Sequence, residues 1–212
     1  MGDCLIFPSE KVKDLGVILD ERLCMKQQVS SLVSQCHNQL RKIGRVRRNL
    51  TTAACHSAMR NTILTRLDYC NSLLGNVGAV QVGRLQRVQN SAARIISLKR
   101  KDESISPTIM SLHWLKVRER ITFKILTITF KCLQSTAPEY LDELVPVYKP
   151  VRSLRSSIAN NIDAPKLMKK VGEGAFSAAA PKLWNGLPPQ LKSCGSLSQF
   201  KKLLKTYLFT QW

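Results

Sequence analysis

Residues 80–98 read VQVGRLQRVQNSAARIISL and decide the fold of the central part of the chain. The apolar side chains in this stretch recur at the spacing of one helix face, at Leu85, Val88, Ala92, Ile95 and Ile96. Three arginines line up beside that stripe, namely Arg84, Arg87 and Arg94. The pattern predicts a helix that buries one face in a core and keeps a cationic flank.

The surrounding sequence is strongly basic. The 212-residue chain has a net charge of +19, from 33 Lys and Arg against 14 Asp and Glu, and an isoelectric point near 10.0. Within residues 22–101, fifteen basic residues stand against a single acid, Asp68. A row of arginines can be an ordinary solvated helix face, but such a face usually mixes both signs of charge. The excess therefore favours a polyanionic partner.

The same arrangement recurs on the predicted helix over residues 23–48, where Arg41, Arg45 and Arg48 follow one another at helical spacing. Contacts to phosphates position a nucleic acid without reading its sequence, so we expect low base specificity. The candidate nucleic-acid-binding residues are Arg41, Arg45, Arg47, Arg48, Arg84, Arg87, Arg94, Lys99, Arg100 and Lys101.

The remaining pattern predicts a mainly helical fold that begins with a short β-hairpin made of residues 4–7 and 12–19. Further helices are expected from Thr51 or Thr52 toward Leu74, near Pro107, over residues 117–133, over residues 176–184, and after the capping box Ser196-Leu197-Ser198-Gln199. The polar segment 149–175 is expected to be a loop that can hold two short strands near residues 161–172 and to mark a boundary between subdomains.

Motifs of catalysis are missing from the sequence. The aspartates are dispersed, and there is no Walker loop, GxGxxG or GxSxG, so the chain is predicted to be no enzyme and to use no cofactor. Cys36-His37 and Cys55-His56 suggest zinc, but neighbours on a helix diverge by about 100°, which favours buried thiols instead. Trp114, Trp184 and Phe176 have the residue types that stack on bases, yet their aliphatic surroundings favour core packing.

Seven cysteines without CxxC spacing indicate reduced thiols and a cytoplasmic or nuclear protein. The sequence contains no run of about 18 apolar residues, so no membrane span is predicted.

Successive blocks of the chain resemble the C-terminal portion of LINE-type (non-LTR, jockey-like) retrotransposon reverse transcriptases, over roughly residues 4–210. The blocks are VKDLGVILDERL at 12–23, RLDYCNSLL at 66–74, RLQRVQNSAARII at 84–96, LHWLKVRERITFKIL at 112–126, RSLRSS at 152–157, FSAAAPKLWNGLPPQL at 176–191 and SLSQFKKLLKTYLF at 196–209. Their order and spacing together carry the resemblance. Two positions depart from the family, which commonly has Pro where Lys116 stands and Arg where Gly174 stands.

The resemblance implies that residues 1–20 are a remnant of the polymerase palm, that residues 21–101 are a helical thumb, and that residues 102–212 are a helical C-terminal domain. The catalytic aspartates of such a polymerase would lie upstream, so the chain is expected to be a non-catalytic fragment that binds RNA or an RNA/DNA duplex, with the rest of a full-length polymerase as a further partner. Two alternatives stay open at this stage. The chain could be a helical protein-interaction module, or a translated remnant that folds poorly because a palm strand without its sheet leaves an unpaired edge.

Overall fold

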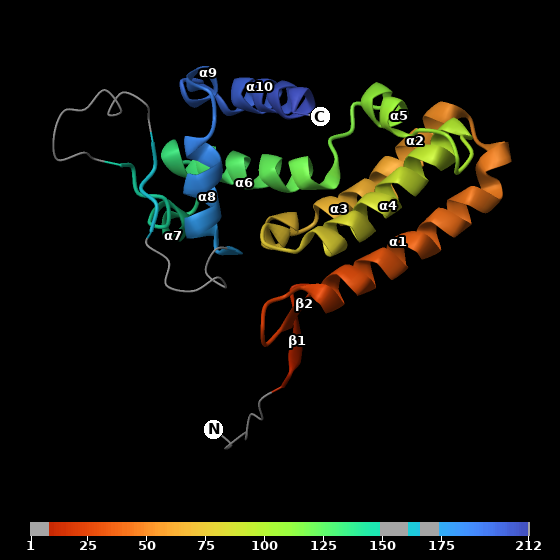
Figure 1. The fold of residues 1–212 in the computed structure, drawn as a ribbon, viewed down its shortest axis with the longest axis horizontal. Coiled ribbons are helices and arrows are strands. Elements are labelled where there is room, and N and C mark those ends of the chain that lie inside the picture. The colour runs from red at the N-terminus through yellow and green to blue at the C-terminus, as the bar shows by residue number, and fades with distance from the viewer. Residues whose placement is uncertain (1–8, 149–160, 166–173, 212) are drawn as a thin grey trace.

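The computed structural model describes residues 9–148, 161–165 and 174–211. Helices dominate these residues, and a two-stranded antiparallel hairpin precedes them (Figure 1). The predicted fold class is therefore confirmed. Within the described residues, no helix combines the length and the apolar character that crossing a membrane requires.

Both strands of the hairpin fall on the stretch that was expected to be a single strand, residues 12–19, and the hairpin extends it by one residue at each end. Strand β1 (Lys11–Asp14) pairs with β2 (Val17–Asp20), and Val12 stands opposite Leu19. Leu15 and Gly16 between them have φ angles of 43° and 84°, the positive values of a tight two-residue hairpin turn.

The prediction of one strand over residues 12–19 was therefore wrong, because the apolar run continues through the turn. The hydroxyl of Tyr69 donates to the carbonyl oxygen of Leu15 at 2.6 Å and helps to hold this turn. The proposed partner strand, residues 4–7, lies outside the described residues.

Two long helices, α1 (Lys26–Val46) and α4 (Ala79–Ser97), run parallel and side by side (Figure 1). Near their N-terminal ends, Arg84 Nη1 donates to Ser30 Oγ at 2.9 Å. Near their C-terminal ends, Arg47 donates to the carbonyl oxygens of Ile95 and Ile96, both at 2.8 Å. The predicted apolar stripe of α4 faces the core, although Ile95 is only partly buried.

Several short segments connect these two helices: η1 (Arg47–Asn49), α2 (Thr52–Met59), the π-helical turn η2 (Arg60–Leu64), α3 (Thr65–Asp68) and η3 (Asn71–Leu74). The side chain of Thr51 caps α2 by accepting from the backbone N–H of Ala54, as expected. This helix was predicted to run toward Leu74. It stops instead after Asp68, where Tyr69 is extended and Cys70 adopts a left-handed conformation.

The second half of the chain packs around α6 (Val117–Leu133), which is buried over much of its circumference as predicted. Its other helices are α5 (Ser106–Ser111), α7 (Glu139–Asp142), α8 (Phe176–Asn185), α9 (Pro189–Lys192) and α10 (Leu197–Thr210). The expected cap of α10 is present, because Ser196 Oγ accepts from the backbone N–H of Gln199 at 3.2 Å.

Phe130, Trp184 and Phe200 meet in the core between α6, α8 and α10, with the Phe130 and Phe200 rings stacked at 4.4 Å between centroids. Trp114 is also buried and Phe176 is partly buried, which confirms core packing rather than exposed stacking surfaces for Trp114 and Trp184. The buried residues before and after position 101 form one continuous hydrophobic cluster. The proposed division at that position stays a prediction.

The polar segment 149–175 is described only in part. Ile162 forms an isolated antiparallel bridge with Val147, and the amide side chain of Asn185 exchanges hydrogen bonds with the backbone of Ile162. Residues 166–173, which cover most of the predicted short strands, and the RSLRSS block at 152–157 lie outside the described residues.

Candidate nucleic-acid interface

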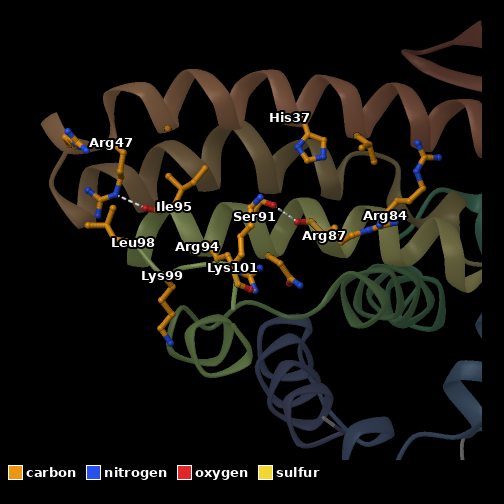
Figure 2. A pocket seen from close by; sticks show the side chains of 14 residues that line it. His37, Arg47, Arg84, Arg87, Ser91, Arg94, Ile95, Leu98, Lys99 and Lys101 are labelled. Atoms are coloured by element: carbon orange, nitrogen blue, oxygen red, sulfur yellow. Dashed lines mark hydrogen bonds between the residues drawn. The ribbon is translucent and has the colours of Figure 1, made fainter. Parts of the chain in front are cut away.

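An open groove of about 920 Å³ lies along the seam between α1 and α4 and continues over the loop that follows α4 (Figure 2). Half of its lining residues are basic, and these are Arg47, Arg48, Arg84, Arg87, Arg94, Lys99 and Lys101. The others include the apolar side chains of Val33, Ile95 and Leu98. The groove is therefore lined by cationic side chains and by apolar ones.

Helix periodicity explains how α4 supplies one wall. Arg84, Arg87, Ser91 and Arg94 are spaced by three or four residues, so they project from one side of α4. The opposite side carries the fully buried residues of the same helix. Burial of that apolar face sets the rotation of α4 and thereby directs the arginines toward the groove.

Arg84 lies where the two helices begin to run together. Its Nη1 donates to Ser30 Oγ on α1 at 2.9 Å and to Gln81 Oε1 on α4 at 3.0 Å. Both acceptors are neutral, so the positive charge is positioned but not neutralised. Because these hydrogen bonds already fix the guanidinium, it can bind an anion with little further loss of side-chain entropy.

Arg47 requires a revision of the sequence-based prediction. Its side chain is buried, with only 8% of the residue exposed. Its nitrogens donate to the carbonyl oxygens of Leu50, Ile95 and Ile96 at 2.8–2.9 Å. The last carbonyls of a helix have no partner within the helix, and Arg47 satisfies two of them at the end of α4. We therefore assign Arg47 to the stability of the helix pair and exclude it from the proposed phosphate contacts.

Arg94 organises the loop after α4. Its guanidinium donates to the carbonyl oxygens of Arg100, Lys101 and Glu103 at 3.2–3.4 Å. These bonds fold the loop back toward the helix, and no acid of the described residues forms an ion pair with Arg94. Lys99 and Lys101 consequently join the lining of the same groove.

Arg48, Arg87 and Lys101 are the least constrained cations of the groove. All three are exposed, and within the described residues no acid forms an ion pair with them. Arg87 comes from the middle of α4, away from both helix ends (Figure 2). A helix end attracts charge because of the peptide dipoles, but that effect fades beyond the terminal turn and does not explain a cation at this position.

Three of the predicted residues do not line the groove. Arg41 and Arg45 are exposed on α1, where Arg41 donates to Asn38 Oδ1 at 2.9 Å. Arg100 is exposed in the loop after α4, and its backbone N–H donates to the Glu103 carboxylate at 2.7 Å. These side chains add positive charge around the groove without forming its wall.

Sequence reasoning missed the neutral polar residues of the groove, namely His37, Asn90 and Ser91. Asn90 and Ser91 stand three and four residues after Arg87, so the helical spacing that identified the arginines also identifies them. His37 was considered only as a partner of Cys36 in a metal site. In the structure His37 lines the groove, whereas Cys36 faces the core.

The electrostatic balance of the groove is uniformly positive. No Asp or Glu is among its lining residues. The described part of the chain contains two ion pairs, Arg22 with Glu21 and Arg120 with Asp68, and both lie elsewhere. Because α1 and α4 run parallel, the negative ends of their dipoles lie together near Arg48, Arg94 and Lys99, where cations stabilise them. That structural role accounts for part of the charge, but not for Arg84 or Arg87.

The cysteines and histidines that suggested zinc are not gathered in one place. Among residues 9–148, 161–165 and 174–211, no three His, Cys, Asp or Glu side chains lie close enough together to hold a metal ion. Burial raises the pKa of the Cys36 thiol to about 11 and also raises the pKa of Cys55. Such thiols stay protonated at neutral pH, which disfavours both nucleophilic chemistry and metal binding at these positions.

No protein-family model, no curated protein and no solved structure matches this chain.

Proposed function

We propose that this protein binds the phosphate backbone of RNA or of an RNA/DNA duplex, without catalysis of its own and with little discrimination between sequences. The observation that carries the proposal is the groove between α1 and α4, in which six cations other than Arg47 meet no acid. The six are Arg48, Arg84, Arg87, Arg94, Lys99 and Lys101. A polyanion is the partner that relieves their mutual repulsion.

The geometry favours backbone contact over base reading. Three of the cations come from α4, one from the turn η1 that follows α1, and two from the loop after α4, so they form an extended row rather than a single cluster. Specific base recognition needs side chains that reach base edges, usually from a helix inserted in the major groove. Here the charged flank of α4 stands beside α1, and the groove is open along its length.

A titration of fluorescent heteropolymer RNA and of an RNA/DNA duplex tests this proposal. If about six phosphates are neutralised, the logarithm of the affinity falls against the logarithm of salt concentration with a slope of about −4 to −5. A shuffled sequence of the same length should bind equally well. A slope near zero, or strong preference for one sequence, would contradict backbone binding.

The origin of the chain in a LINE-type retrotransposon reverse transcriptase belongs to the same proposal. Binding of the nucleic-acid backbone is the role expected of a polymerase thumb. The remaining polymerase domains would then be partners of this segment in a full-length element. The structure describes the backbone at both positions that depart from the family pattern, Lys116 and Gly174. Lys116 has a φ of −60°, the value that proline adopts. A Cβ on Gly174 would lie 2.6 Å from Cβ of Asn76, so a larger residue there would need a shift of the backbone.

Such a role implies a compartment that contains RNA, the cytoplasm or the nucleus. The described cysteines, at positions 24, 36, 55, 70, 132 and 194, are all free thiols. Reduced thiols are the usual state in both compartments.

A protein-interaction role is the second candidate, and a separate apolar groove favours it. This groove of about 850 Å³ lies between the end of the hairpin, the start of α4 and the start of α8. Leu23, Leu73 and Val80 on its walls expose 59%, 51% and 73% of their surface. Exposed apolar clusters of this kind often mark a contact with another protein.

The RNA titration also separates the two candidates. Tight, salt-dependent binding at low salt supports the nucleic-acid role. An absence of RNA binding at about 50 mM salt, in a protein that melts cooperatively, supports the protein-interaction role instead. A non-cooperative melt would show that the chain does not form a stable fold.

A further inference from the structure

A second polar pocket, of about 620 Å³, lies apart from the cationic groove. Its walls come from α2, the π-helical turn η2, α3, η3, the segment 112–115 before α6, the start of α6 and the middle of α10. Segments far apart in the sequence thus meet around one cavity. Its volume falls in the range of about 300–1,000 Å³ that small-molecule sites occupy.

The pocket carries an excess of positive charge. Arg120 and Asp68 form an ion pair across it, in which Arg120 donates from Nε to Oδ1 at 2.8 Å and from Nη2 to Oδ2. Three further cations line the pocket, Arg60, Lys124 and Lys205. Within the described residues no acid pairs with any of these three.

Lys205 lies close enough to Arg120 and Arg60 for their charges to act on it. The pKa of Lys205 is lowered, first by partial burial and then by the positive charges of Arg120 and Arg60. Asp68 is already paired with Arg120, so the positive charges of the other cations in the pocket are not balanced. A bound anion would neutralise them.

Two buried polar atoms at the pocket wall have no hydrogen-bond partner within the described part of the chain. Asn71 is 2% exposed and its Oδ1 accepts no hydrogen bond, while its Nδ2 donates weakly to Asp68 Oδ1 at 3.4 Å. Nε2 of His56 is also buried and unpaired, and the imidazole ring stacks on Trp114 at 5.8 Å. Buried polar atoms are nearly always satisfied, so each unpaired one points to a missing partner.

The backbone around the pocket is irregular in a way that is frequent at functional sites. The π-helical turn η2 supplies Arg60 and Leu64 to the wall. Such turns insert one extra residue into a helix and are frequent at functional sites. His113, at another wall, has a φ of 53°.

We propose that this pocket binds a small hydroxylated phosphate monoester. Arg60, Lys124 and Lys205 would hold the phosphate group through charge-assisted hydrogen bonds. A ligand hydroxyl would donate to Asn71 Oδ1. The site does not depend on the proposed nucleic-acid role, because it shares no lining residue with the groove between α1 and α4.

Isothermal titration calorimetry on the full chain tests the proposal with four probes: ribose 5-phosphate, 5′-AMP, inorganic phosphate and ribose. We expect ribose 5-phosphate to bind with a dissociation constant below roughly 1 mM, inorganic phosphate to bind more weakly, and ribose not to bind. Comparison of 5′-AMP with ribose 5-phosphate then distinguishes a nucleotide from a sugar phosphate as the preferred ligand. Failure of both phosphorylated sugars to bind would overturn the proposal.

Variants locate the binding. The double substitution Arg60→Gln and Lys205→Gln should weaken ribose 5-phosphate binding by at least about tenfold. Asn71→Leu should weaken ribose 5-phosphate but not inorganic phosphate. Lys202→Gln on the exposed face of α10 is the matched control and should change neither. Unchanged affinity in the double variant would place the ligand elsewhere and refute this site.

Arg87→Gln separates this proposal from the nucleic-acid role. It should weaken RNA binding and leave ribose 5-phosphate binding intact. Loss of sugar-phosphate binding in this variant would mean that the ligand occupies the cationic groove, which also refutes the pocket.

Discussion

Arg47 at the end of α1 donates from Nη2 to the carbonyl oxygen of Ile96 at 2.8 Å and so joins the C-terminal ends of the two parallel helices. A second bond, from Nε to the carbonyl oxygen of Ile95, has the same length. The charge also lies where the negative ends of two helix dipoles converge. One buried arginine thereby sets the alignment of the helices that form the cationic groove.

Arg47→Met should lower the free energy of unfolding by about 3 kcal/mol, because it leaves buried carbonyl groups without donors. The change is measured by urea denaturation followed by circular dichroism. Arg45→Met, at an exposed position of the same helix, is the control and should stay within about 0.5 kcal/mol of the native protein. Equal denaturation midpoints for the two variants would show that the Arg47 hydrogen bonds do not stabilise the fold.

Arg87→Gln should weaken RNA binding several-fold and reduce the salt slope by about 1, because one phosphate contact is lost. The effect should be the same for RNAs of different sequence. Fluorescence anisotropy across a series of salt concentrations measures it. Lys202→Gln removes an exposed positive charge from α10 and should leave the slope unchanged. A similar loss in both variants would mean that net charge, rather than the groove, determines binding.

Asp20 links the hairpin to the start of α1 and should make stability depend on acid pH. Its carboxylate accepts from the backbone N–H groups of Cys24 and Met25, each at 3.0 Å. The hydrogen bond from Cys24 is the main reason that the pKa of Asp20 lies below its ordinary value of 3.8. A lowered pKa in the folded state stabilises the fold above the ordinary pKa, and this contribution disappears as pH falls through the lowered value.

Asp20→Asn should therefore be less stable than the native protein near neutral pH, and the difference should shrink as pH falls below 3.8. Urea denaturation midpoints at several pH values measure this. Asp14→Asn in β1 is the control. A difference between Asp20→Asn and the native protein that stays constant at all pH values would exclude the proposed role of the carboxylate.

Alkylation should distinguish the exposed thiol from the buried ones. Cys24 is exposed, whereas Cys36 is fully buried and its pKa is raised to about 11 by that burial. With iodoacetamide at about pH 8, peptide mapping should find Cys24 modified well before Cys36. Urea should remove the difference. Equal rates in the folded protein would mean that the core around α1 opens readily.

The course of α4 was predictable because a helix repeats its environment every three to four residues. The periodicity of Leu85, Val88 and Ala92 indicated the buried face, and Arg84 and Arg87 followed from it. The same local logic identified the Ser196 cap of α10. These features depend on residues within one or two helix turns of each other, so the order of residues is enough to predict them.

The hairpin is a case in which the local sequence pattern predicted the wrong structure. Val17 and Ile18 continue the same apolar run as Val12 and Leu15, yet the chain reverses at Leu15 and Gly16. Leucine rarely adopts a positive φ, so composition did not indicate the turn. A contact with Tyr69, 54 positions along the chain, accompanies that conformation.

The sequence alone determined which faces of the long helices are apolar and which are cationic, because both depend on spacing within one helix. Only the tertiary structure decided what each charge does. Arg47 and Arg48 are adjacent in sequence, but one is buried against the end of α4 and the other lines an open groove. The second pocket has the same origin, because Asn71, Arg60 and Lys205 share a cavity only after α10 packs against α6. Long-range packing brings such groups together, and no local pattern of residues encodes that proximity.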